Sequence, residues 1–98
     1  MKKMPKPIAF EWNKGNLDKN WNKHKVEIKE AEEVFINKFK MFEDVGHSQI
    51  EKRFSILGET NKKRRLYCSF TVRDGKIRVI SVRDQSRKER RLYEEKNN

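Results

Sequence analysis

The chain has 98 residues, of which 41% are charged and 34% apolar, and a formal net charge of +10. This length predicts a single domain over residues 1–98 with a small core. No window approaches the ~20 apolar residues of a membrane-spanning helix, so we expect a soluble, cytoplasmic protein without membrane contact. The single cysteine, Cys68, excludes an internal disulfide and is expected in the core, and no Cys/His spacing suits zinc.

The positive charge is concentrated in the second half of the chain. All nine Arg lie after residue 50, where fifteen basic and seven acidic residues give a net charge of +8, against +2 for residues 1–49. Basic charge alone indicates nucleic acid, an anionic membrane or an acidic protein as partner. Arg binds phosphate oxygens bidentately, so its confinement to the strand-rich half favours a phosphate-binding surface.

The first half predicts a strand, two helices and a second strand. Residues 1–7 are expected to form a loose basic arm, and residues 8–12 a short strand. Asn13 can cap a helix that ends near residues 23–24 and carries one stripe of side chains, Leu17, Trp21 and His24. A second helix is expected over residues 28–35, with an apolar face and an acidic N-terminal part that we interpret as a solvated face.

The second half predicts strands joined by tight turns. A strand at residues 38–42 and a loop at 43–51 lead to strands at 53–58 and 65–73, which are joined by a basic tip at 61–64. Asp74-Gly75 is a strong type I′ hairpin signal, and it precedes a β-branched run at 77–82 that is typical of a strand buried on both faces. The order β-α-α-β-β-β-β-α predicts an α+β fold with a mostly antiparallel sheet.

The junction after the last strand is the candidate functional site. Ser86 and Glu89 form a capping box, which marks the start of a C-terminal helix. Arg83 ends the strand, and a charged residue there needs an acidic or phosphate partner. Basic and aromatic side chains gather around it: Arg83, Arg87, Lys88, Arg90, Arg91 and Tyr93.

Several short elements of the sequence resemble the BrnT toxin family. The resemblance covers Phe10 to Tyr93 and is carried by Phe10-Glu11-Trp12, Lys23-His24-x-Val26, Glu30-Ala31, Val34-Phe35, Arg53-Phe54, Ile77-Arg78-Val79-Ile80-Ser81, Arg83 and Glu89-Arg90-Arg91-x-Tyr93. Two positions differ: Lys25 stands where the family usually has Gly, and Asn13 where it often has Asp. Gly suits a left-handed helix end, whereas Asn and Asp both cap helices.

The resemblance implies a ribonuclease toxin of a bacterial type II toxin–antitoxin pair, with a fold similar to RelE-type ribonucleases. It implies RNA as the substrate and no cofactor. The implied partner is a BrnA-type antitoxin that forms a heterotetramer with the toxin and alone contacts operator DNA. We expect this antitoxin to cover the second helix and the sheet.

RNA cleavage without a metal ion needs a base for the 2′-OH, cations for the phosphorane and an acid for the leaving oxygen. RelE-like chains carry an Arg early in the strand after the hairpin, and a basic cluster with a Tyr on the last helix. Arg65 matches the first feature, and Arg87 and Tyr93 the second. The expected catalytic residues are Arg65, Arg83, Arg87, Tyr93, His24 and Glu89. The expected RNA-binding residues are Lys23, Arg78, Lys88, Arg90 and Arg91.

Each candidate also has a structural interpretation. His24 can pack within its stripe, His47 can be a turn residue, Glu89 is explained by the capping box, and Tyr93 can pack over the sheet. Arg78 can pair with a carboxylate such as Glu51. Trp12 and Trp21 are expected in the core. The whole chain can alternatively be a binding module that grips nucleic acid or an acidic protein without catalysis.

Overall fold

The computed structural model describes residues 9–47 and 51–95. The elements follow the expected order, as β1 (Phe10–Glu11), α1 (Lys14–His24), α2 (Ile28–Ile36), β2 (Phe39–Glu43), the 3-10 turn η1 (Val45–His47), β3 (Phe54–Glu59), β4 (Arg65–Arg73), β5 (Lys76–Asp84) and α3 (Arg87–Glu94). The expected basic arm and the start of the first strand lie outside the described residues. Within them, no helix is long and apolar enough to span a membrane.

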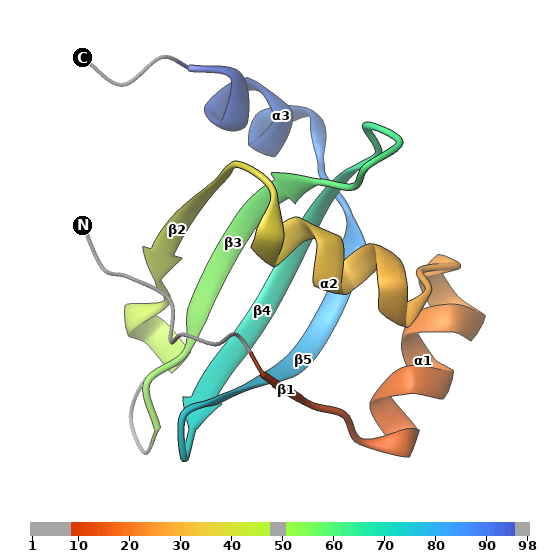
Figure 1. The fold of residues 1–98 in the computed structure, drawn as a ribbon. Coiled ribbons are helices and arrows are strands. Elements are labelled where there is room, and N and C mark those ends of the chain that lie inside the picture. The colour runs from red at the N-terminus through yellow and green to blue at the C-terminus, as the bar shows by residue number, and fades with distance from the viewer. Residues whose placement is uncertain (1–8, 48–50, 96–98) are drawn as a thin grey trace.

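A five-stranded mixed sheet of order β1-β5-β4-β3-β2 forms the centre of the fold. Only the pairing of β1 with β5 is parallel, and the three pairings among β2 to β5 are antiparallel, as the sequence predicts. Figure 1 shows α2 lying across one face of the sheet, α1 beside the β5 edge and α3 across the end where β3 and β5 finish. Among the described residues, no helix lies over the centre of the opposite face.

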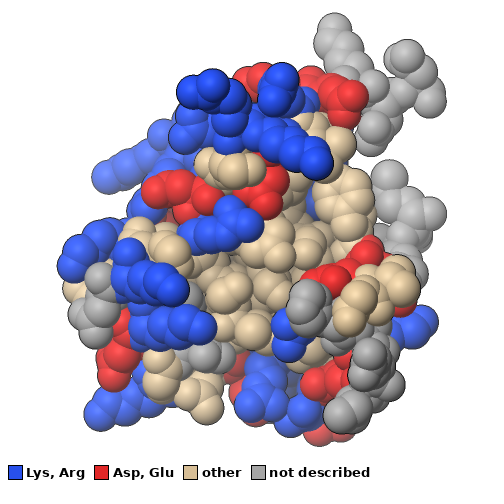
Figure 2. Space-filling view, turned by 180° about the vertical axis from the view of Figure 1, so that it is seen from behind, with Lys and Arg blue, Asp and Glu red and all other residues tan. Residues whose placement is uncertain are grey.

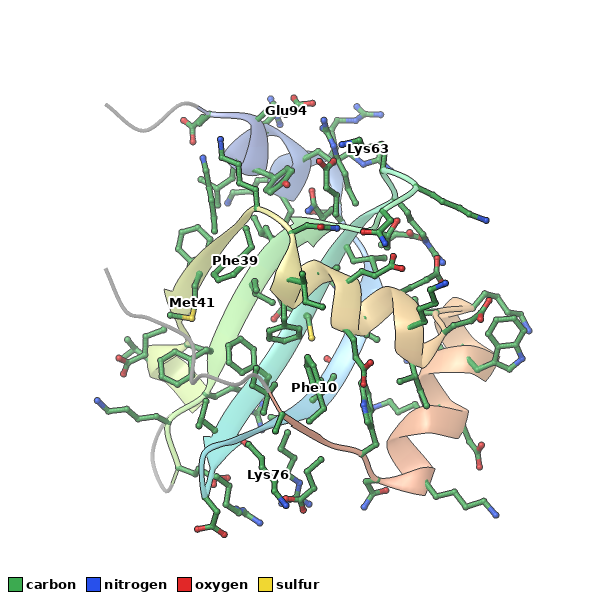
Figure 3. All side chains as sticks on the ribbon, viewed as in Figure 1. Phe10, Phe39, Met41, Lys63, Lys76 and Glu94 are labelled. Carbon is green, nitrogen blue, oxygen red and sulfur yellow. The ribbon has the colours of Figure 1, made fainter. Side chains whose placement is uncertain are left out.

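The core lies between α2 and the sheet. Phe35 of α2 meets Phe70 of β4 edge-on, with ring centroids 4.9 Å apart. Gly58 allows α2 to approach closely, because a Cβ at this position would lie 2.8 Å from Cγ1 of Val34. Phe10, Phe39 and Met41 extend this cluster at its rim (Figure 3). Cys68 is buried, as predicted, and burial raises the pKa of its thiol.

Turns and caps form where the local sequence predicts them. Asp74 and Gly75 have φ angles of 53° and 75°, which fit the type I′ hairpin. The side chain of Asn13 accepts a hydrogen bond from the amide of Gly15 at 2.8 Å. Lys25 takes a left-handed φ of 54°, and its amide donates to the carbonyl of Trp21 at 2.9 Å. The left-handed residue that ends α1 is therefore a Lys here, at a position that favours Gly.

Two expectations about burial are wrong. β5 is not buried on both faces, because α1 and α2 cover one face only, and Arg78 and Arg83 on the other face are half-buried. Trp21 is 48% exposed and not in the core. Trp12, by contrast, packs against the core as expected, and its Nε1 donates to Glu32 at 2.9 Å.

Candidate active site at the α3 end of the sheet

The open face of the sheet places Tyr67 of β4 beside Arg83 of β5, because these two residues are register partners. Side chains alternate between the two faces along a strand, and Cys68, next to Tyr67, and Val82, next to Arg83, face the core. The side chains of Tyr67 and Arg83 therefore point away from α2. Figure 2 shows this face, with Lys and Arg gathered at its α3 end, Asp and Glu beside them and uncharged surface across the centre. Strand alternation thus brings Arg83 to a charged rim around an open surface.

Arg83 is held between an aromatic ring and a carboxylate. Its Nη1 and Nη2 donate to the two oxygens of Glu89 at 2.8 and 3.0 Å. The guanidinium carbon lies 4.1 Å from the centre of the Tyr67 ring, and the Tyr67 hydroxyl lies 3.1 Å from Ser55 Oγ. The expected acidic partner of Arg83 is therefore Glu89, in a bidentate pair that fixes the guanidinium plane.

Glu89 has a second bond that fixes the start of α3. It accepts from the amide of Ser86 at 2.8 Å, and Ser86 Oγ accepts from the amide of Glu89 at 3.2 Å, which confirms the predicted capping box. Partial burial raises the pKa of Glu89, but hydrogen bonds from Arg83 and Ser86 outweigh this effect, and the net pKa is lowered. The carboxylate is thus ionised at neutral pH.

Arg65 forms a second cation–carboxylate pair next to the first. It binds Glu94 of α3, and its guanidinium lies 5.6 Å from the ring centre of Tyr93. The Tyr93 hydroxyl donates to the carbonyl of Lys38 at 3.0 Å. Burial and the charge of Glu59 raise the pKa of Tyr93 and Arg65 lowers it; the net shift is upward, so the phenol keeps its proton at neutral pH.

Polar contacts hold α3 to the sheet. None of its residues is buried, and Lys40 of β2 donates to the carbonyls of Leu92, at 2.7 Å, and Glu95. The outward side of the helix carries four exposed cations that make no ion pair with the described residues: Arg87, Lys88, Arg90 and Arg91. α3 thus carries two paired carboxylates, of Glu89 and Glu94, and four unpaired cations.

The structure places Lys23 and His24 away from this cluster, at the end of α1. The carbonyl of His24 accepts from Nη2 of Arg64 at 3.1 Å, and Nε of the same guanidinium donates to Asp84 at 2.8 Å. Asp84 and Arg83 are consecutive in β5, so they project from opposite faces of the sheet. The fold therefore separates His24 from the Arg83 cluster.

Two other candidates, Arg78 and His47, are not part of this cluster. Arg78 is half-buried on β5, opposite Thr71. The alternative that Arg78 pairs with Glu51 is not observed, since Arg73 binds both oxygens of Glu51 at 3.1 Å. The side chain of His47 lies outside the described residues.

Sequence reasoning missed Tyr67, Ser55, Lys40 and the role of Arg64. Tyr67 could have been found, since alternation in a strand that begins at Arg65 puts residues 65 and 67 on one face. The contacts of Lys40 and Arg64 join residues 20 to 55 positions apart, which no local pattern predicts.

The cluster contains the groups that RNA cleavage requires. Arg83 and Arg65 offer positive charge for a phosphorane, Glu89 is an ionised carboxylate, and Tyr67 and Tyr93 carry phenolic protons. In the described part of the chain, no group of three or more His, Cys, Asp or Glu side chains could hold a metal ion.

Comparison with known proteins identifies a matching family and a solved structure of similar fold. A family model described as "Ribonuclease toxin, BrnT, of type II toxin-antitoxin system" matches residues 12–89. The crystal structure of the Brucella abortus ribonuclease toxin BrnT, at 1.1 Å resolution, is similar in fold, with a TM-score of 0.64 and 22% sequence identity over 82% of this chain and 99% of that chain. Comparison with curated protein sequences gave no significant match.

Proposed function

The chain belongs to the BrnT family of ribonuclease toxins of type II toxin–antitoxin systems, and from this premise we propose that it is a metal-independent endoribonuclease whose RNA cleavage stops translation and growth. The observation that carries the proposal is the pair of Arg83 and Glu89 over Tyr67, on an open sheet face beside the cationic helix α3. We place the reaction centre there.

In the proposed reaction, Glu89 accepts the proton of a 2′-OH as the 2′-oxygen bonds to phosphorus and the bond to the 5′-oxygen breaks. Arg83 stabilises the charge of the phosphorane. The leaving 5′-oxygen needs a proton, which we assign to the Tyr67 hydroxyl because this ring lies directly against Arg83. Tyr93 then serves as the aromatic support of Arg65.

The RNA strand enters this reaction centre across the outer side of α3. Its unpaired cations, Arg87, Lys88, Arg90 and Arg91, can neutralise backbone phosphates on either side of the cleaved bond. Arg78, further along the same sheet face, extends this path. We assign His24 a structural role, since it lies apart from Arg83.

The family implies an antitoxin protein as partner. We propose that this partner is a BrnA-type protein that forms a heterotetramer with the toxin and alone binds operator DNA. Co-purification with the product of the adjacent gene tests this assignment, and recovery of the toxin alone contradicts it.

The ribonuclease proposal is tested by inducible expression of the wild type, Arg83→Ala and Arg73→Ala in bacteria, with growth and total RNA followed together. Arg73 is the matched control, because it also forms an exposed ion pair but lies at the other end of β4. The expected result is growth arrest with RNA breakdown, lost in Arg83→Ala and kept in Arg73→Ala. Arrest with intact RNA would instead support a non-catalytic binding module. The purified wild type should cleave RNA equally with and without EDTA.

A further inference from the structure

We propose that Arg65 and Tyr93 form a second RNA phosphate site beside Arg83, and that the Glu94 carboxylate occupies this site until RNA displaces it. The inference rests on the proposed function and deepens it. Glu94 is then an internal competitor that limits the affinity of the free toxin for RNA.

The first argument is the position of the two Arg residues. Tyr67 is the register partner of Arg83, and the amide of Gln85 donates to the carbonyl of Arg65 at 3.1 Å, so Arg65 and Arg83 are diagonal neighbours on adjacent strands. Such neighbours have Cα atoms roughly 7–8 Å apart and share one face. Arg65, beside the ring of Tyr93, is therefore placed to bind a phosphate next to the one at the proposed reaction centre.

The second argument is that each guanidinium already holds an oxyanion. Carboxylates and phosphates both accept N–H bonds from a guanidinium group, so a carboxylate oxygen at Arg65 occupies the place of a phosphate oxygen. Arg65 donates one bond to Glu94, through Nη1, whereas Arg83 donates two bonds to Glu89.

The third argument is that the two carboxylates differ in how firmly they are held. The Glu89 side chain is 22% exposed and also caps α3, so its movement would break the helix start. The Glu94 side chain is 56% exposed, and among the described residues its carboxylate binds only Arg65. Glu94 can therefore leave by rotation of its own side chain.

The helix dipole gives no other reason for an acid at this place. The C-terminal end of a helix carries partial negative charge, so Glu94 in the last turn of α3 is unfavourable unless a cation compensates it. Arg65 binds this carboxylate directly, and Arg91 also lies in the last turn. Displacement by a phosphate exchanges one anion at Arg65 for another and returns the carboxylate to water.

The test compares RNA binding by the wild type, Glu94→Gln and Glu95→Gln. Glu95 is the matched control, because it is the exposed neighbour with the same charge and its side chain makes no bond with the described residues. The probe is a single-stranded 2′-O-methyl oligonucleotide, which lacks the attacking hydroxyl, and Kd is measured by fluorescence anisotropy. Glu94→Gln should lower Kd about two- to fivefold more than Glu95→Gln does, the range set by the strength of exposed ion pairs.

An Arg65→Ala background completes the design. There, Glu94→Gln should change Kd only as much as Glu95→Gln does. Equal effects of the two substitutions in the wild-type background, an effect of Glu94→Gln that persists without Arg65, or no binding of the oligonucleotide would each overturn the proposal. Because the probe cannot be cleaved, failure of the ribonuclease proposal appears separately, as intact unmodified RNA in a protein that still binds.

Discussion

Replacing Arg64 by Ala should destabilise the protein more than an ordinary surface substitution does, because this side chain joins four parts of the fold. Its guanidinium donates to Asp84 at the end of β5, to Glu30 of α2, and to the carbonyls of His24 and Lys25 at the end of α1. Arg64 itself lies in the β3–β4 connection. Loss of this residue therefore frees the end of one helix and separates three other elements.

The magnitude follows from the contacts that are lost. The two carbonyls lose a hydrogen-bond partner, which costs about 1 kcal/mol each. The two ion pairs are half-exposed, with Arg64 at 28% and Asp84 at 57%, so solvent screening reduces each to about 0.5 kcal/mol. The free energy of unfolding should fall by about 3 kcal/mol, a large part of the ~5–15 kcal/mol of a typical domain. For this chain length, Tm should fall by about 12–24 °C.

Urea unfolding followed by circular dichroism at pH 7 measures this change, with Arg73→Ala as the control of equal charge. The pKa of Asp84 is lowered, mainly by its hydrogen bond with Arg64, so its stabilising effect is complete above its ordinary value of 3.8 and is lost as the pH falls through the folded value. The difference between wild type and Arg64→Ala should therefore shrink at pH 3. A loss below about 1 kcal/mol at pH 7 would refute the reasoning.

Three further predictions concern single positions. Gly58→Ala should cost about 1–3 kcal/mol, because its Cβ meets Val34 Cγ1 at 2.8 Å, whereas Gly46→Ala, with its nearest atom at 3.8 Å, should change urea unfolding little. Tyr67→Phe should lower RNA cleavage about 100-fold with unchanged RNA binding, and an unchanged cleavage rate would exclude the hydroxyl as the acid. Glu89→Gln should destabilise the fold at pH 7 but less at pH 3. The reason is the lowered pKa of Glu89, which makes its stabilising effect complete only above roughly pH 4.5. Unfolding curves of wild type and variant that differ equally at both pH values would contradict this.

The sequence predicts well the features that depend on neighbouring residues. The turn at Asp74-Gly75 and the capping box of Ser86 and Glu89 form because their backbone requirements lie within two to four residues. Alternation and apolar runs locate the strands within one or two residues of their ends, and the 65–73 prediction matches β4.

The features missed depend on which elements become neighbours. Nothing near residue 64 shows that its guanidinium will reach Glu30 and Asp84, and nothing near residue 10 shows that β1 will pair in parallel with β5. The irregular register between Ser69 and Phe70 also changes which β5 residues face the core, since a shift of one residue turns each side chain to the other face. Sequence reasoning therefore named part of the cluster, Arg83, Glu89, Arg65 and Tyr93, but not Tyr67 or the pairing of Arg65 with Glu94.

The attachment of α3 mainly by polar contacts has a consequence for how the molecule fluctuates. Segments without buried apolar side chains detach at a free-energy cost well below that of global unfolding, and their amides exchange with solvent through this local opening. Dissolved salt weakens the ion pairs of α3 while the core under α2 is unaffected. Glu89 and Glu94 travel with the helix, so each opening event removes both carboxylates from Arg83 and Arg65 and exposes the two guanidinium groups together.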